Sequence, residues 1–177
     1  MQSIAPKHLE DRFAKLKVLV VDDDQYMRKV VRTMLTVIGV RQIHEAIDGT
    51  SGLNAIREIG PDLVLVDWEM PTIDGMQFVR LVRWPGGACP VPDVPIIMLT
   101  GHGDRWRVVE AARLGVHEYL LKPVSTKALL DRLVSIFSNP RAIVKGGGYY
   151  GPTPRKVVSI LDEKTVAVPR HDVVVLN

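Results

Sequence analysis

The stretch DLVLVD at residues 62–67 decides the fold, and KVLVVD at residues 17–22 repeats its character. Both are short apolar runs of Val and Leu without polar alternation, a pattern typical of parallel strands that are buried on both faces. Each run ends in an aspartate. Because ligands bind outside the carboxyl ends of strands in open α/β sheets, we expect both aspartates to lie at a binding edge.

Strand and helix patterns alternate five times along the chain. Three further strands are predicted, a weak one over residues 41–46 and two clearer ones over 95–100 and 116–121. Helices are predicted over 25–38, 50–59 and 76–83, from Asp104 to 114, and from Ser125 to 137, with Asp104 and Ser125 as N-caps. This alternation favours a doubly wound α/β sheet whose strand ends meet in one crevice.

The segment WPGGACPVPDVP at residues 84–95 is predicted to be a loop, because four prolines and two glycines interrupt it. It is either a surface for a partner or a neutral insertion. It carries Cys89, the single cysteine of the chain, which cannot form an internal disulfide and fits a reducing cytoplasm.

Composition and charge limit the possible functions. A chain of 177 residues suits one ordinary domain with some residues to spare. Residues 1–137 hold 17 basic and 17 acidic residues, whereas residues 138–177 hold 6 basic and 3 acidic ones, so the formal charge of +3 lies in the tail. This is a weak signal for nucleic acid, which is not the expected partner. No uncharged apolar stretch approaches the roughly 18 residues of a membrane span, and the charged N-terminus is unlike a signal peptide, so we expect a cytoplasmic protein.

Beyond residue 138 the alternation of strand and helix patterns ends. We therefore predict a division into residues 1–138 and a tail of residues 139–177. The segment GGGYYGPTPRK at residues 146–156 is rich in Gly and Pro and is predicted to be a linker. The runs KVVSIL, KTVAV and DVVVL that follow are short and β-prone. Bare β edges pair readily, so we expect these runs to pack on the same chain, exchange with a second subunit or await a partner.

Polar residues follow four of the predicted strands. Asp22 and Asp23 follow the first, Asp67 and Thr100 end the third and fourth, and Lys122 follows the fifth. Clustered carboxylates supply the hard oxygen ligands that Mg²⁺ prefers, and their mutual repulsion favours a divalent cation. A carboxylate can also attack phosphorus to give an aspartyl phosphate, which requires positioning and neutralisation of the phosphoryl oxygens. The ammonium and hydroxyl groups of Lys122 and Thr100 suit that task.

Each of these residues has an ordinary interpretation when it is taken alone. Residues 22–24 would form a turn and a helix N-cap, and Asp67 would simply end a strand. Thr100 before a glycine would belong to a turn, and Lys122 before a proline to a solvated loop. Taken together, in this order and at strand ends, they predict a phosphorylatable aspartate site.

The chain from about residue 17 to 138 resembles the receiver domain of bacterial two-component response regulators. The resemblance rests on VLVVDDD at 18–24, LVLVDWEMPTIDG at 63–75, IIMLTG at 96–101 and EYLLKP at 118–123. It implies a flavodoxin-like fold with the strand order 2-1-3-4-5, which is known for this family.

The resemblance also implies the chemistry of the site. Asp67 would accept phosphate from a histidine kinase or a histidine phosphotransfer protein. Asp22 and Asp23 would bind Mg²⁺ together with Asp67 and the backbone carbonyl of Glu69, with Asp23 preferred as a direct ligand.

Four more roles follow from the same resemblance. Thr100 and Lys122 would contact the phosphoryl group. Tyr119 matches an aromatic switch that turns inward as the threonine moves to the phosphate, although an ordinary half-buried strand tyrosine is the alternative. Glu69 and His102 lie at positions that tune the phosphoryl lifetime in this family, although His102 can equally be an ordinary loop residue.

We therefore expect a phosphoacceptor switch that signals through protein–protein contacts with a downstream protein, and not an enzyme beyond its own phosphorylation and dephosphorylation. One alternative is a transcriptional regulator whose basic tail binds nucleic acid. The other is an assembly regulator that forms a homodimer through the tail or the last helices, which is compatible with the first hypothesis. The tail is similar, through Tyr149–Pro152 and the basic pair Arg155 and Lys156, to a short tail of some α-proteobacterial regulators.

Overall fold

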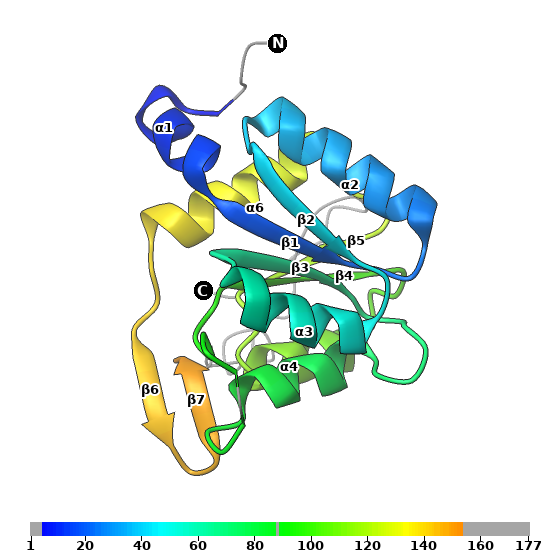
Figure 1. Ribbon diagram of the computed structural model, residues 1–177, viewed down its shortest axis with the longest axis vertical. Coiled ribbons are helices and arrows are strands. Elements are labelled where there is room, and N and C mark those ends of the chain that lie inside the picture. Colours follow the sequence, from blue (N-terminus) through cyan, green and yellow to red (C-terminus); the bar gives the residue numbers. More distant parts are fainter. Residues whose placement is uncertain (1–4, 88, 154–177) are drawn as a thin grey trace, which may run out of the picture.

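The computed structural model describes residues 5–87 and 89–153. Five parallel strands form the central sheet, with the order β2-β1-β3-β4-β5 (Figure 1). They are β1 (Lys17–Val21), β2 (Gln42–Ala46), β3 (Leu63–Asp67), β4 (Ile96–Thr100) and β5 (Glu118–Leu121). The predicted doubly wound, flavodoxin-like architecture and strand order are confirmed, and the register places Asp67 opposite Leu99 and Thr100 opposite Leu121.

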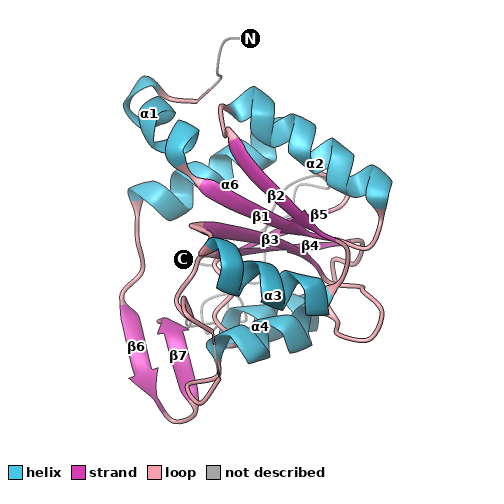
Figure 2. Ribbon diagram, in the orientation of Figure 1, coloured by secondary structure: helices cyan, strands magenta, loops and turns pink. Residues whose placement is uncertain are grey.

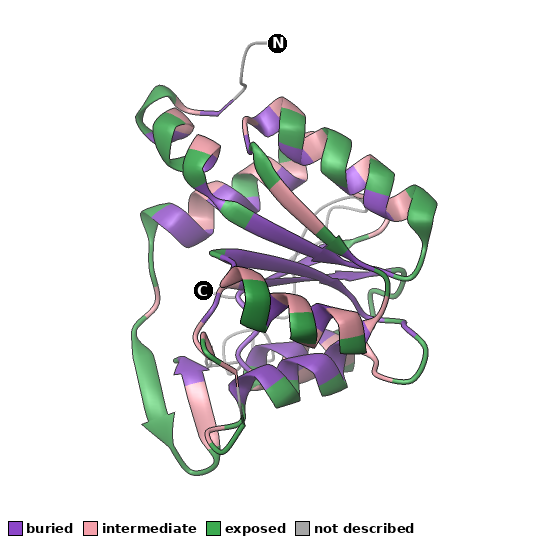
Figure 3. Cartoon of the chain, in the orientation of Figure 1, coloured by how far each residue is buried: buried purple, intermediate pink, exposed green. Residues whose placement is uncertain are grey.

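Helices cover both faces of the sheet (Figure 2). One face packs against α2 (Gln25–Ile38) and α6 (Thr126–Ser138), and the other against α3 (Gly49–Ile59), α4 (Gly75–Arg83) and α5 (Arg105–Arg113). The central strands are buried on both sides, as Figure 3 shows. Double burial accounts for the unbroken Val and Leu runs in β1 and β3, because neither face of these strands meets water.

Short polar side chains set the helix starts. Asp24 accepts hydrogen bonds from the amides of Tyr26 and Met27, and the predicted cap Ser125 accepts one from the Ala128 amide. Asp104 occupies the N-cap position of α5, as predicted, but its side chain makes no capping hydrogen bond. Its carboxylate lies instead 3.6 Å from Nε of Arg107.

An additional helix, α1 (Lys7–Lys15), precedes the sheet and was not predicted. Its buried residues, Leu9 and Phe13, lie one turn apart, so the charged N-terminal sequence forms an amphipathic helix. The Phe13 ring packs edge-on against Phe137 of α6 with centroids 6.1 Å apart. Arg12 donates a hydrogen bond of 2.9 Å to the Phe137 carbonyl.

A β-hairpin follows α6, so the linker interpretation is wrong for this part of the tail. Its strands are β6 (Ile143–Gly146) and β7 (Tyr149–Pro152), which pair antiparallel. The three consecutive glycines at residues 146–148 all have positive φ angles, which suits a chain reversal rather than a flexible spacer. The β-prone runs predicted further along lie outside the described residues.

The hairpin packs against the α/β domain at a buried arginine. Arg83, at the end of α4, donates to the carbonyl oxygens of Pro92, Val94 (2.8 Å) and Gly115 (3.0 Å). Burial lowers the pKa of Arg83 to about 10, so the side chain is still charged at neutral pH. Gly151 of β7 lies directly on it, since a Cβ there would be 2.6 Å from Cδ of Arg83. Arg83 thus contacts both the 84–95 loop and the hairpin.

None of the helices in the described ranges is long and apolar enough to cross a bilayer.

Candidate functional site

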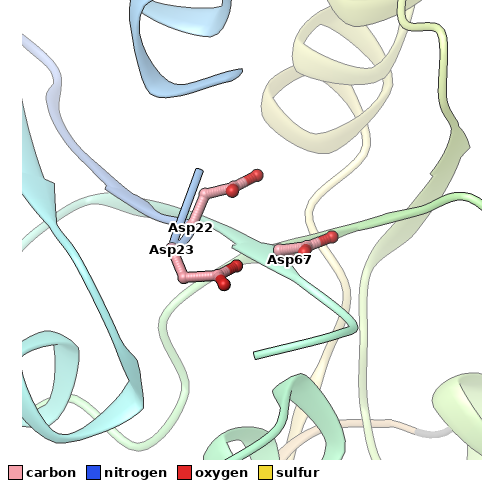
Figure 4. A group of neighbouring side chains, drawn as sticks. All are labelled: Asp22, Asp23 and Asp67. Carbon is pink, nitrogen blue, oxygen red and sulfur yellow. The ribbon is translucent and has the colours of Figure 1, made fainter. Parts of the chain in front are cut away.

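Three carboxylates meet at the carboxyl edge of the sheet. Asp22 and Asp23 directly follow β1, Asp67 ends β3, and one oxygen from each lies within 4.8 Å of the others. All three side chains extend to the same side of the strand ends (Figure 4). Asp22 and Asp67 are buried, whereas Asp23 is exposed and therefore accessible to an ion arriving from solvent.

Lys122 crosses to two of these carboxylates from the end of β5. Its Nζ lies 2.8 Å from Oδ1 of Asp67 and 3.0 Å from Oδ2 of Asp22. Burial opposes the charge of Lys122, but the hydrogen bonds to Asp67 and Asp22 outweigh it and raise the pKa of the ammonium group. Burial also raises the pKa of Asp67, although the hydrogen bond from Lys122 acts in the opposite direction.

Arg28 holds the turn that carries Asp22 and Asp23. This buried side chain of α2 donates to the carbonyl oxygens of Asp22 (2.8 Å) and Asp23 (3.3 Å), and its Nε lies 3.3 Å from Glu45. Arg28 was not predicted from the sequence, because an arginine within a helix usually faces solvent. The only sequence signal for its role was its position one helical turn after the aspartates.

Gly75 allows the loop after β3 to close tightly against Asp67. A Cβ at this position would lie 2.3 Å from the carbonyl oxygen of Asp67. The Gly75 amide donates to the Trp68 carbonyl at 2.9 Å. Any side chain at residue 75 would therefore push α4 away from the end of β3.

Thr100 and Tyr119 share one backbone acceptor. The Thr100 hydroxyl donates to the His102 carbonyl at 3.4 Å and accepts from the His102 amide at 3.1 Å. The Tyr119 hydroxyl donates to the same carbonyl at 2.7 Å. Tyr119 is buried, which raises the pKa of its phenol and keeps it a donor at neutral pH. The tyrosine already lies inward, linked to the loop that follows Thr100.

Glu69 and His102 contact each other at the rim of the site. His102 Nε2 lies 2.9 Å from Oε1 of Glu69, and Nη1 of Arg107 lies 3.4 Å from the same oxygen. The structure thus brings together the two residues that the family resemblance singled out, and adds Arg107. Their effect on phosphoryl lifetime, and the role of the Glu69 backbone carbonyl as a metal ligand, stay predictions.

The donor set fits a hard divalent cation. The ligands on offer are carboxylate oxygens from two adjacent strands, and Lys122 offsets only part of their charge. Mg²⁺ retains several waters and binds through one or two carboxylates, which suits the exposed Asp23 beside the buried Asp67. This arrangement defines a class of protein, an open parallel sheet with an acidic, lysine-bridged site at its switch point.

The chain belongs to the response regulator receiver domain family, whose profile matches residues 18–134. In general, members of this family are phosphorylated on aspartate in a Mg²⁺-dependent manner and act as signalling proteins. The chain is 32% identical over 122 residues to chemotaxis protein CheY-3 of Vibrio cholerae, covering 69% of this chain and 92% of the relative. It is also 32% identical to chemotaxis protein CheY of Pseudomonas aeruginosa, with coverage of 69% and 96%.

Solved structures give the same result. The chemotaxis response regulator CheY4 of Vibrio cholerae aligns with a TM-score of 0.61 and 30% identity, covering 68% of this chain and 98% of that one. The Francisella response regulator 1452 receiver domain aligns with a TM-score of 0.63 and 26% identity, with coverage of 72% and 100%. Helix α1 and the hairpin lie outside the residues that match the family profile.

Proposed function

We propose that this chain is a phosphoacceptor response regulator in which Asp67 receives a phosphoryl group in a Mg²⁺-dependent manner. The observation that carries the proposal is the contact of Asp67 with Lys122 at 2.8 Å, beside the carboxylates of Asp22 and Asp23. The donor would be a histidine kinase or a histidine phosphotransfer protein. In the transfer, a carboxylate oxygen of Asp67 forms a bond to phosphorus while the bond from phosphorus to the donor's imidazole nitrogen breaks.

The residues around Asp67 have separate tasks in this proposal. Asp22 and Asp23 would hold Mg²⁺, which when bound neutralises phosphoryl oxygens and helps orient them. The Lys122 ammonium, which bridges Asp67 and Asp22, would move from a carboxylate to a phosphoryl oxygen. The Thr100 hydroxyl would donate to another oxygen after leaving the His102 carbonyl.

Transmission would run from Thr100 to the outer surface. When Thr100 gives up the His102 carbonyl, Tyr119 stays hydrogen bonded to it and couples the loop to β5. Phosphorylation would then stabilise one position of this loop over another, and the surface of α5, β5 and α6 would change for a downstream protein. We place this activity in the cytoplasm, with self-phosphorylation and self-dephosphorylation as the sole chemistry of the chain.

Tryptophan fluorescence tests the proposal directly. Trp68 follows Asp67, is 7% exposed, and packs against Trp106 and Tyr119. Adding Mg²⁺ and then beryllofluoride should change the emission in two steps, and Asp67→Asn should abolish the beryllofluoride step. Asp11→Asn, an exposed aspartate of α1 outside the carboxylate cluster, is the matched control and should respond like the wild type. A beryllofluoride response that survives in Asp67→Asn would refute the assignment.

A second candidate function is assembly through the tail. All four residues of β6 are exposed, including Ile143 and Val144 at 44% and 40%, and an exposed strand edge favours pairing with another chain. We propose residues 1–138 as the signalling domain and residues 139–177 as the assembly element. Light scattering of the full chain and of a chain ending at Pro140, which lacks β6, tests this candidate. Equal molar masses at all concentrations would eliminate residues 141–177 as the assembly element.

A further inference from the structure

Arg107 occupies an unusual position on the first turn of α5. Its guanidinium lies over two indole rings, 5.1 Å from the ring centroid of Trp68 and 5.2 Å from that of Trp106. The two rings are perpendicular, with centroids 6.4 Å apart. The side chain of Arg107 is only 18% exposed, so the planar group is fixed between the rings rather than moving in solvent.

From this position Arg107 reaches the rim of the phosphorylation site. Its Nη1 lies 3.4 Å from Oε1 of Glu69, the oxygen that His102 contacts at 2.9 Å. Glu69 stands two residues after Asp67 in the sequence and carries a negative charge. A carboxylate free to turn inward would repel an anionic phosphoryl group. The two contacts hold the Glu69 carboxylate on the rim instead.

We propose that Arg107 is a positioning residue for phosphoryl retention, which acts by holding the Glu69 carboxylate away from the group bound at Asp67. The inference rests on the proposed function, because it concerns the retention of that phosphoryl group. The two indoles hold the arginine, the arginine holds the glutamate, and the strength of anion binding at Asp67 depends on this chain of contacts.

The geometry suits an arginine at this position, because its charge reaches Glu69 while its planar group lies over the two rings. A lysine can pair with Glu69 as a point charge, but it lacks the planar group that two rings enclose. A methionine retains the length of the side chain and part of its contact with the rings while it removes the charge. These substitutions therefore separate the charge contribution of Arg107 from its packing.

Beryllofluoride binding at saturating Mg²⁺ gives the test, with the dissociation constant measured by fluorine NMR. A double-mutant cycle compares the wild type, Arg107→Met, Glu69→Gln and the double variant. We expect Arg107→Met to weaken binding about three- to fivefold, the scale of a partly exposed ion pair. In the Glu69→Gln background the same change should alter binding less than about twofold, because the repelling charge is gone. Arg107→Lys should recover most of the affinity.

Arg113→Met, on the last turn of the same helix, removes an equal charge from an exposed position and should leave the dissociation constant unchanged. Equal losses from Arg107→Met in both backgrounds would overturn the proposal, since Arg107 would then act through packing or its direct field. No loss in Arg107→Met would overturn it as well. If the wild type itself failed to bind beryllofluoride, the proposed function would be contradicted. That outcome is distinct from the two above, in which the wild type binds and only the effect of Arg107→Met is in question.

Discussion

At the scale of single residues, Asp67 lies between two opposing influences. Burial disfavours its ionised form, whereas Lys122 at 2.8 Å favours it, and the net result is a raised pKa. A carboxyl group whose folded-state pKa is raised contributes stability that is fully present below the unfolded pKa, which is about 3.9 for aspartate. That contribution is lost as the pH rises through the folded-state pKa.

This reasoning gives a prediction for Asp67→Asn in the absence of metal. The variant should unfold at a higher urea concentration than the wild type at pH 7.5, because it avoids a buried charge, and the difference should shrink toward pH 4. Urea titrations in EDTA at both pH values measure it. A difference that instead grew as the pH fell would show that Lys122 outweighs burial.

The residues of the site were predictable from sequence to the extent that their positions follow from strand ends. Asp22, Asp67, Thr100 and Lys122 each end or follow a strand, and parallel strands bring their carboxyl ends to one edge. Supporting residues such as Arg28 lie on helices, where sequence alone does not show which side chain turns inward.

At the scale of elements, the hairpin is a docked structure. Gly151 lacks the positive φ angles of residues 146–148, so an alanine suits its backbone, yet its Cβ would lie 2.6 Å from Cδ of Arg83. Arg83 has little room to yield, because three carbonyl oxygens hold its guanidinium. We predict that Gly151→Ala destabilises the docked hairpin by about 1–3 kcal/mol.

Hydrogen exchange of the Thr153 amide, which donates to the Ala142 carbonyl at 2.7 Å, reports on the hairpin. The exchange rate should rise in Gly151→Ala. Gly101→Ala is the matched control, since a Cβ at Gly101 meets nothing within 4 Å. Unchanged exchange in Gly151→Ala would mean that the hairpin is not held against Arg83.

Helix α1 supplies a second test at this scale. Phe13 is fully buried against Phe137, so Phe13→Ala should lower the free energy of unfolding by about 3–5 kcal/mol. The exposed neighbour Asp11, changed to alanine, should shift it by no more than about 0.5 kcal/mol. Chemical denaturation of both variants measures the difference, and similar values for the two would show that α1 does not pack as described.

The elements that sequence analysis missed share a physical cause. The three central strands, β1, β3 and β4, carry their own signal, because burial on both faces leaves unbroken apolar runs. Helix α1 buries only one narrow stripe, and its many charges concealed that stripe. The hairpin reverses direction at three glycines, which are common in linkers and in turns alike. The β-prone pairs Ile143–Val144 and Tyr149–Tyr150 on either side of the glycines were the sequence signal that favoured a hairpin over a linker.

At the scale of the whole molecule, metal binding should couple to stability. In the proposed function Mg²⁺ binds the carboxylate cluster of the folded chain and has no such site in the unfolded one, so it should stabilise the fold by mass action. At a free concentration ten times the Kd the gain should be about 1.4 kcal/mol. Thermal unfolding with Mg²⁺ and with EDTA measures it. Asp23→Asn should remove most of the gain, and an undiminished gain would place the ion elsewhere.

The central claim is that the folded chain accepts a phosphoryl group on Asp67. Intact-mass spectrometry after incubation with acetyl phosphate tests it most directly. With Mg²⁺, the wild type should gain one phosphoryl group, whereas Asp67→Asn, or the wild type in EDTA, should gain none. No adduct on the wild type, or an adduct that persists in Asp67→Asn, would contradict the account.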